Sequence, residues 1–190
     1  MSDDALPPAE TRWEGRYIAV EQRGTWEYVR RARDIRAAVI LAIEEQSEGR
    51  SVILVEQYRV PLGKRCIELP AGLIGDDDAN EPAATAAARE LDEETGYRAA
   101  VLSDAGEYYL SPGMVSESFT LFIARGLTRV HDGGGVEGEN IVVHRVALPA
   151  LPGFIAAKRA EGCGIDVKLL LLLGAGLIEP QPSDQRKLSA

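Results

Sequence analysis

One segment of this 190-residue chain constrains its fold more than any other: Gly75 to Tyr97, GDDDANEPAATAAARELDEETGY. Its Ala-rich sequence predicts a helix, on which Glu90, Glu93 and Glu94 share a face because they are spaced i, i+3 and i+4. Each like-charged pair costs such a helix a few tenths of a kcal/mol, roughly, and a bound cation would offset that cost. Carboxylate oxygens suit Mg²⁺ or Mn²⁺ better than zinc. The alternative is an ordinary surface helix with a charged solvent face.

The rest of the sequence predicts mainly strands. A turn signal at residues 22–24 separates two strand-like segments, 13–20 and 25–31, which indicates a hairpin. Further strands are expected at 36–43, 51–57, 65–69, 99–110, 116–124 and 140–146, and helices at 80–95, 149–160 and 165–177. Many strands with few helices favour an α+β domain or an α/β/α layered domain over a helical bundle.

Charge and composition narrow the classes of partner. The net charge of −9 does not favour a nucleic acid or an anionic membrane surface as partner. The longest apolar run, near Leu169 to Leu173, is far shorter than the roughly 20 residues that span a bilayer. The acidic N-terminus does not resemble a signal peptide, and the two cysteines lie far apart. These features predict a cytoplasmic protein with reduced thiols.

The acidic segment also matches a family pattern, G-x5-E-x7-R-E-U-x-E-E-x-G-U, in which U is a bulky aliphatic residue. Eight of the nine defined positions agree, namely Gly75, Glu81, Arg89, Glu90, Leu91, Glu93, Glu94 and Gly96. The departure is Tyr97, which places an aromatic ring at a packing position. The segment therefore resembles the Nudix box, and this spacing favours the metal site over the bare charged helix.

The resemblance implies a Nudix hydrolase that cleaves nucleoside diphosphates linked to another moiety, with Mg²⁺ or Mn²⁺ as the cation. The implied fold is α+β, a Nudix-type α/β/α sandwich with a mixed β-sheet, preceded by an N-terminal β-hairpin. It implies an N-terminal tail and hairpin at 1–34, a Nudix domain at 35–180 and a polar tail at 181–190. The implied metal ligands are Glu90, Glu94, the shared Glu93 and the Ala71 carbonyl, with Arg89 holding a carboxylate in place.

Three further segments, residues 24–31, 55–73 and 111–117, resemble the ADP-ribose pyrophosphatase branch, in which a proline such as Pro112 follows the box by 15 residues. That branch implies a homodimer with exchanged N-terminal strands, in which Trp13 and Trp26 stack on the adenine. The other implied substrate-binding residues are Glu27, Arg31, Arg59, Glu68 and Met114. Packing of the tryptophans against the sheet is the structural alternative.

The Gly-rich loop from residue 133 to residue 140 offers the general base, and the resemblance allows either Glu137 or Glu139. Its glycines suggest a loop that can swing over the site. The same loop resembles that of GDP-mannose pyrophosphatases, so hydrolysis of another nucleoside diphosphate sugar stays open. A non-catalytic, nucleotide-sensing module is a third alternative, which the intact box disfavours.

Overall fold

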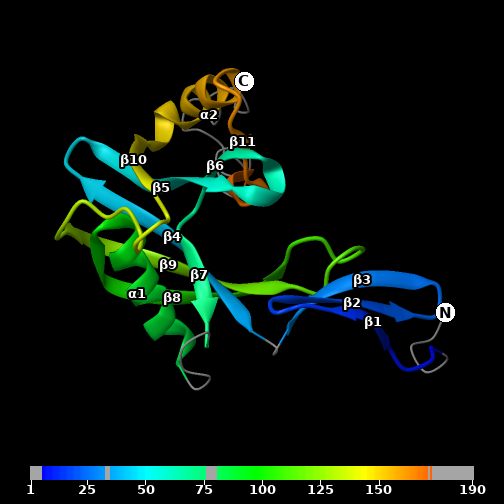
Figure 1. Ribbon diagram of the computed structural model, residues 1–190. Helices are drawn as coiled ribbons and strands as arrows, with labels where there is room; N and C mark the ends of the chain where they lie inside the picture. Colours follow the sequence, from blue (N-terminus) through cyan, green and yellow to red (C-terminus); the bar gives the residue numbers. More distant parts are fainter. Residues whose placement is uncertain (1–5, 33–34, 76–80, 171, 173–190) are drawn as a thin grey trace, which may run out of the picture.

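The structure is a computed structural model, which describes residues 6–32, 35–75, 81–170 and 172. An N-terminal sheet of three antiparallel strands extends to one side of the main body (Figure 1). Its strands are β1 (Glu10–Glu14), β2 (Ile18–Arg23) and β3 (Trp26–Arg31). It joins the main body where the Val29 amide donates to the Met114 carbonyl (2.9 Å) and the Ser116 amide donates to the Val29 carbonyl (2.9 Å).

The predicted hairpin around residue 24 is confirmed, but the prediction of one strand over residues 13–20 is wrong. That segment contains the end of β1, a turn and the start of β2, and the Gly15 amide closes the turn on the Ile18 carbonyl (2.9 Å). The Trp13 ring folds over this turn, where a side chain at Gly15 would lie 2.4 Å from the ring. A glycine at this turn therefore gives room for the indole.

The main sheet has eight strands in the described chain, and six of them run in the order β11-β6-β5-β4-β9-β8, with β10 paired to β5 and β7 paired to β4. It is mixed, because β4–β9 and β6–β11 are parallel and the other pairs are antiparallel. The strands are β4 (Arg36–Gln46), β5 (Gly49–Arg59), β6 (Lys64–Glu68), β7 (Ala71–Ile74), β8 (Tyr97–Tyr109), β9 (Ser118–Arg129), β10 (Val142–Ala147) and β11 (Gly164–Ile165).

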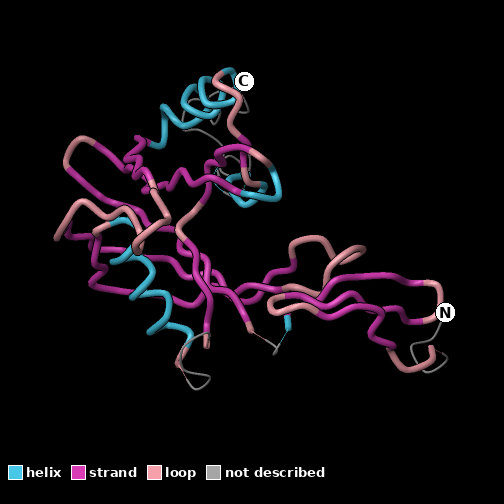
Figure 2. The backbone as a smooth tube through the Cα atoms, in the orientation of Figure 1, coloured by secondary structure: helices cyan, strands magenta, loops and turns pink. Residues whose placement is uncertain are grey.

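Two helices, α1 (Ala83–Thr95) and α2 (Leu151–Ala160), pack on separate core clusters. On β4, Val39 belongs to the cluster of α2, whereas Ala38 and Ile40 belong to the cluster of α1. This alternation follows from the two-residue period of a strand, which points neighbouring side chains to opposite faces. The predicted α+β class with a mixed sheet is confirmed, and Figure 2 shows how strongly strands dominate the tube.

Two of the predicted helices begin at other residues than expected. Helix α1 begins at Ala83 with Pro82 as its N-cap; Asn80, the first residue of the predicted helix, lies outside the described residues. The helix expected from residue 165 begins differently: residues 164–165 form β11, and Val167–Leu169 form the 3-10 helix η5. The parallel pairing of Ile165 with Ile67 draws this segment into the sheet. The remainder, including the polar tail at 181–190, lies mostly outside the described residues.

Two further 3-10 helices, η3 (Val60–Leu62) and η4 (Leu148–Ala150), connect strands and α2. No helix within the described ranges has the length and hydropathy of a membrane-spanning segment.

Candidate active site

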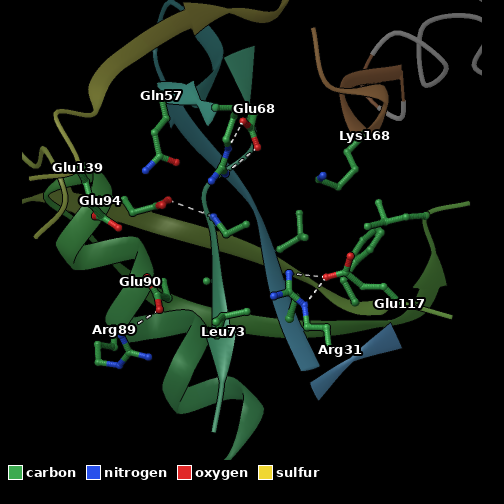
Figure 3. A pocket seen from close by; sticks show the side chains of 17 residues that line it. Arg31, Gln57, Glu68, Leu73, Arg89, Glu90, Glu94, Glu117, Glu139 and Lys168 are labelled. Carbon is green, nitrogen blue, oxygen red and sulfur yellow. Dashed lines mark hydrogen bonds and ion pairs between the residues drawn. The ribbon is translucent and has the colours of Figure 1, made fainter. Parts of the chain in front are cut away.

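A cavity of about 500 Å³ opens between α1, the main sheet, the end of β3 and the segment that carries η5 (Figure 3). Among the described residues, four basic and five acidic side chains line it, which gives its wall a formal charge of −1. These side chains are Arg31, Arg59, Arg89, Lys168, Glu68, Glu90, Glu94, Glu117 and Glu139. The acidic side chains of α1 and the 133–140 loop occupy one half, and Arg31 and Lys168 occupy the other.

Glu94 is the most buried carboxylate of the cavity wall, with 5% of its surface exposed. Its Oε2 accepts a hydrogen bond from the Ala71 amide (3.0 Å), which ties α1 to the start of β7. Burial raises the pKa of Glu94 to about 8; the Ala71 amide opposes this shift, while the charges of Glu90 and Glu139 add to it. Burial and the neighbouring carboxylates therefore disfavour the ionised form of Glu94.

Glu90 reaches the cavity across Gly72. A side chain at Gly72 would lie 1.8 Å from the Glu90 Cδ, so only glycine leaves room for this carboxylate. Burial raises the pKa of Glu90, although the charge and the hydrogen bond of Arg89 counteract it. The half-buried Glu90 and the buried Glu94 thus share one acidic wall, one helical turn apart.

Arg89 anchors several of the acidic residues at once. Its Nη1 donates to Glu90 Oε1 (2.9 Å) and to Glu93 Oε2 (3.1 Å), and its Nε donates to Glu81 Oε1 (3.3 Å). Glu93 is more exposed than its neighbours and does not line the cavity. The structure therefore joins Glu93 to the site only through Arg89.

The donor chemistry of the acidic wall fits a hard divalent cation. Glu90, Glu94 and Glu139 face the same cavity, and the charge of Glu139 adds to the raised pKa of Glu90 and of Glu94, as expected of carboxylates that share a site. Their oxygens are the donors that Mg²⁺ prefers. Within the described residues no three His, Cys, Asp or Glu side chains converge on a common point, so the structure does not present a closed coordination sphere.

The Gly-rich loop separates the two candidate bases. Glu139 lines the cavity and is half-buried, with its Oε2 accepting from the Val136 amide (2.9 Å). Glu137 is exposed and is not part of the cavity wall.

The glycines of this loop dock it on the end of α1. The Gly134 and Gly135 amides donate to the Glu94 and Glu93 carbonyls (2.9 and 3.0 Å), which are exposed helix-end acceptors. The glycines here allow close backbone approach, which differs from the expected freely swinging loop.

The predicted substrate-binding residues divide into two groups. Arg31, Arg59 and Glu68 line the cavity; Arg59 binds Glu68 through two hydrogen bonds (2.7 and 2.9 Å). Trp13, Trp26, Glu27 and Met114 do not line it, and both tryptophans are 55% exposed. The N-terminal sheet carries the tryptophans away from the cavity of this chain (Figure 1).

Trp26 instead lines a second hollow of about 390 Å³. Its other walls include Tyr28, Pro112 and Val115.

Several cavity residues were not anticipated. Gln57 lies two residues before Arg59 on β5, and strand periodicity places both on one face, so the sequence did carry this signal. Glu117 binds Arg31 (2.6 Å) across 86 residues of chain, and Lys168 comes from the η5 segment; neither follows from local sequence. The further apolar lining comes from Leu110 and Phe119.

Comparison with known proteins adds a family match. A family model described as NUDIX domain matches residues 33–150. The chain is 36% identical to "Putative nudix hydrolase 2" of Caenorhabditis elegans over 70% of this chain and 63% of that protein. It is 37% identical to "GDP-mannose pyrophosphatase" of Cronobacter sakazakii over 77% of this chain and 78% of that protein. It is 38% identical to "ADP-ribose pyrophosphatase" of Bacillus subtilis over 48% of this chain and 46% of that protein.

Some relatives are longer than their matched region: the match spans less than two thirds of the Caenorhabditis elegans protein. Among solved structures, "Crystal structure of ADP compounds hydrolase" superimposes with a TM-score of 0.64, covering 91% of this chain and 93% of that one. At 22% sequence identity, this likeness shows a shared fold.

Proposed function

This chain belongs to the Nudix family, and from that premise we propose that it hydrolyses the pyrophosphate of ADP-ribose, giving AMP and ribose 5-phosphate, with Mg²⁺ as cofactor. The observation that carries the proposal is the buried acidic wall of the cavity. A pyrophosphate is itself an anion, so it approaches such a wall only when a divalent cation reverses the local field. Bound there, Mg²⁺ would polarise the phosphate and activate water.

The residues of the acidic wall have separate roles in this proposal. Glu90 and Glu94, together with the Ala71 carbonyl, would hold the cation, and Mn²⁺ could replace Mg²⁺. Arg89 would keep Glu90 in place and would connect it to Glu93. Glu93 accordingly acts as a supporting residue in this proposal, whereas the sequence pattern suggested a shared ligand.

Glu139 would accept the proton of the attacking water. It shares the cavity with Glu90 and Glu94, and the Val136 amide fixes its carboxylate. A candidate base must lie within reach of the reacting water, which favours Glu139 over the exposed Glu137.

Arg59 would bind the pyrophosphate oxygens. Glu68 accepts from the Arg59 Nε and Nη2 (2.7 and 2.9 Å), which fixes the guanidinium at the cavity wall and leaves its Nη1–Nη2 edge as the fork for phosphate oxygens. Arg31 stands farther from the acidic wall, toward the other end of the cavity (Figure 3).

GDP-mannose is the second candidate substrate, because a relative with that name matches over most of this chain. A non-catalytic sensing module is a less suitable reading, since Glu90, Glu93 and Glu94 of the sequence pattern are all present.

The N-terminal sheet and residues 1–34 would serve dimerisation and base stacking. Trp13 and Trp26 are half exposed and lie outside the cavity of their own chain, so in a homodimer they could reach the nucleotide of a neighbouring copy. Glu27 and Met114, which are also exposed, would take part in the same contact. We place the protein in the cytoplasm, where its unpaired Cys66 and Cys163 would stay reduced.

A substrate panel tests the proposed function. Purified protein with Mg²⁺ is incubated with ADP-ribose, ADP-glucose, GDP-mannose and UDP-glucose, and the nucleoside monophosphates are separated and quantified. ADP-ribose should give AMP and ribose 5-phosphate with the highest kcat/KM. Faster release of GMP from GDP-mannose would select the second candidate, and no release from any substrate would favour the sensing module.

A further inference from the structure

Lys168 presents its ammonium group to the half of the cavity that lies opposite the acidic wall (Figure 3). Its side chain is only 11% exposed, and its Nζ lies 2.6 Å from Asp166 Oδ2 and 5.8 Å from the centroid of the Phe119 ring. A lysine is rarely buried to this degree unless it is paired. The burial of the Lys168 ammonium therefore needs an explanation other than solvation at the surface.

The segment around Lys168 is firmly attached to the sheet. Asp166 caps η5 through the Lys168 amide (2.7 Å), and the Asp166 amide donates to the Ile67 carbonyl (3.0 Å). Leu169, which is fully buried, anchors the next position in the core. The ammonium is thus held at the cavity wall by a segment beyond residues 33–150, the part that the family model matches.

Both cations in this half of the cavity are already matched by a carboxylate. Arg31 Nη2 lies 2.6 Å from Glu117 Oε1, as Lys168 lies beside Asp166. A subsite for a phosphate needs an excess of positive charge, which the proposed Mg²⁺ would add at the acidic wall, whereas the two pairs here are balanced. Matched donors and acceptors instead suit a neutral group with several hydroxyls, each of which both donates and accepts.

Apolar side chains lie beside both pairs. The Phe119 ring centroid is 5.8 Å from Lys168 Nζ, the Leu110 amide donates to the Glu117 carbonyl (3.4 Å), and both residues line the cavity. Polar groups that converge over an apolar floor are typical of small-molecule sites, and a sugar ring has both hydroxyl edges and an apolar C–H face.

We propose that Lys168, with the Arg31–Glu117 pair, forms a subsite for the hydroxyl groups of the sugar that lies beyond the pyrophosphate, and that Lys168 determines which sugar is accepted. The inference rests on the proposed function, because it assumes that the pyrophosphate occupies the acidic half. Lys168 would donate to a sugar hydroxyl while Asp166 keeps the ammonium aligned.

Lys168→Met tests this subsite, since methionine keeps much of the length and removes the donors. With Mg²⁺, kcat/KM is measured for ADP-ribose and ADP-glucose, and inhibition constants are measured for AMP and ribose 5-phosphate. The variant should lose about tenfold or more in kcat/KM on the preferred sugar, because a hydrogen bond to a charged group is lost. The ratio of its kcat/KM values for the two substrates should move toward one. Inhibition by ribose 5-phosphate should weaken, while inhibition by AMP should not change.

Lys64→Met is the matched control, because Lys64 is exposed and lies outside the cavity wall; it should leave all four constants unchanged. Lys168→Arg keeps the charge but changes the shape, so it should retain more activity than Lys168→Met with an altered sugar preference. If Lys168→Met fails to fold, the arginine variant decides by that preference.

Unchanged sugar preference in the Lys168 variants, or equal weakening of AMP and ribose 5-phosphate, overturns the subsite while leaving the proposed function intact. A wild-type protein that cleaves none of the nucleoside diphosphate sugars overturns the proposed function, and the subsite with it.

Discussion

Glu137 and Glu139 are two positions apart in the sequence, but their side chains have different environments in the fold. Glu139 faces the acidic wall of the cavity, whereas Glu137 points to solvent. Sequence spacing could not distinguish them, because the loop has no regular period from which a side-chain direction follows. The difference depends on Gly134 and Gly135, which dock the loop on the end of α1.

The base assignment predicts unequal effects of two similar substitutions. Glu139→Gln should lower kcat by about 10²-fold or more, because the proton acceptor is lost, while Glu137→Gln should retain close to wild-type turnover. Steady-state hydrolysis of ADP-ribose at saturating Mg²⁺ measures both. Full activity in both variants, or a larger loss at Glu137, would refute the assignment.

Sequence reasoning succeeded for residues on regular elements and failed for those brought together by the fold. Glu90 and Glu94 face the same cavity, as their helical spacing predicts. Arg59 lies on a strand face that also carries Gln57. Lys168 and Glu117 enter the cavity from distant segments, and nothing in their local sequence indicates it. The exposure of Trp13 and Trp26 depends on where the N-terminal sheet projects, which composition does not reveal.

At the scale of elements, the junction between α1 and the Gly-rich loop depends on backbone approach. Gly96 ends α1 with φ 72°, and a side chain there would lie 2.1 Å from the His131 carbonyl oxygen. The sequence predicted Gly96 as the helix end; the contact with residue 131 appears only in three dimensions.

Gly96→Ala should therefore destabilise the protein by about 1–3 kcal/mol, through left-handed backbone strain and the clash with residue 131. Gly153→Ala is the matched control: Gly153 lies within α2 with no atom within 4 Å of an added Cβ, so alanine should stabilise by up to about 1 kcal/mol. Urea unfolding gives both values. Equal free energies of unfolding for the two variants would contradict the proposed junction.

A second junction joins four elements through one buried carboxylate. Glu56 on β5 contacts Arg65 on β6, His144 on β10 and Lys158 on α2 (2.6, 2.9 and 3.1 Å). Burial raises the pKa of Glu56, but hydrogen bonds from His144, Lys158 and Arg65 outweigh burial and lower it from 4.5 to about 2. Arg65 also donates to the carbonyl of Asn140 (3.1 Å), beside Glu139.

Because the pKa of Glu56 is lower in the folded protein, its contribution to stability is complete above pH 4.5 and is lost as the pH falls toward 2. The shift corresponds to about 3 kcal/mol. Glu56→Gln should thus lower the free energy of unfolding by about 3 kcal/mol at pH 7 and by clearly less at pH 3. Denaturant unfolding at both pH values measures the difference, and a gap that does not narrow at pH 3 would contradict this account of the junction.

At the scale of the whole molecule, the main sheet and the N-terminal sheet carry different groups of the predicted site residues. The main sheet and α1 hold the cavity, while the N-terminal sheet projects from it and carries both tryptophans (Figure 1). The α+β class was predictable from strand-length apolar runs, whereas the mixed sheet was implied by the family resemblance. How the two sheets are arranged was not, because it depends on the pairing of Val29 with Val115.

If the N-terminal sheet serves dimerisation, light scattering should give about twice the 20.5 kDa mass of the chain. Removing residues 1–31 should give a monomer with a much higher KM for ADP-ribose, because the stacking tryptophans and Arg31 are lost. A full-length monomer with the same KM at all concentrations would contradict dimerisation and would require the tryptophans to act within one chain.

The most direct test of the whole account is AMP release from ADP-ribose as a function of Mg²⁺ concentration, in the wild-type protein and in Glu94→Gln. The buried acidic wall predicts no release in EDTA, saturable release with Mg²⁺, and at least about a 10²-fold lower kcat in Glu94→Gln. Release that persists in EDTA, or a Glu94→Gln protein with wild-type turnover, would contradict a cation-dependent pyrophosphatase at this site.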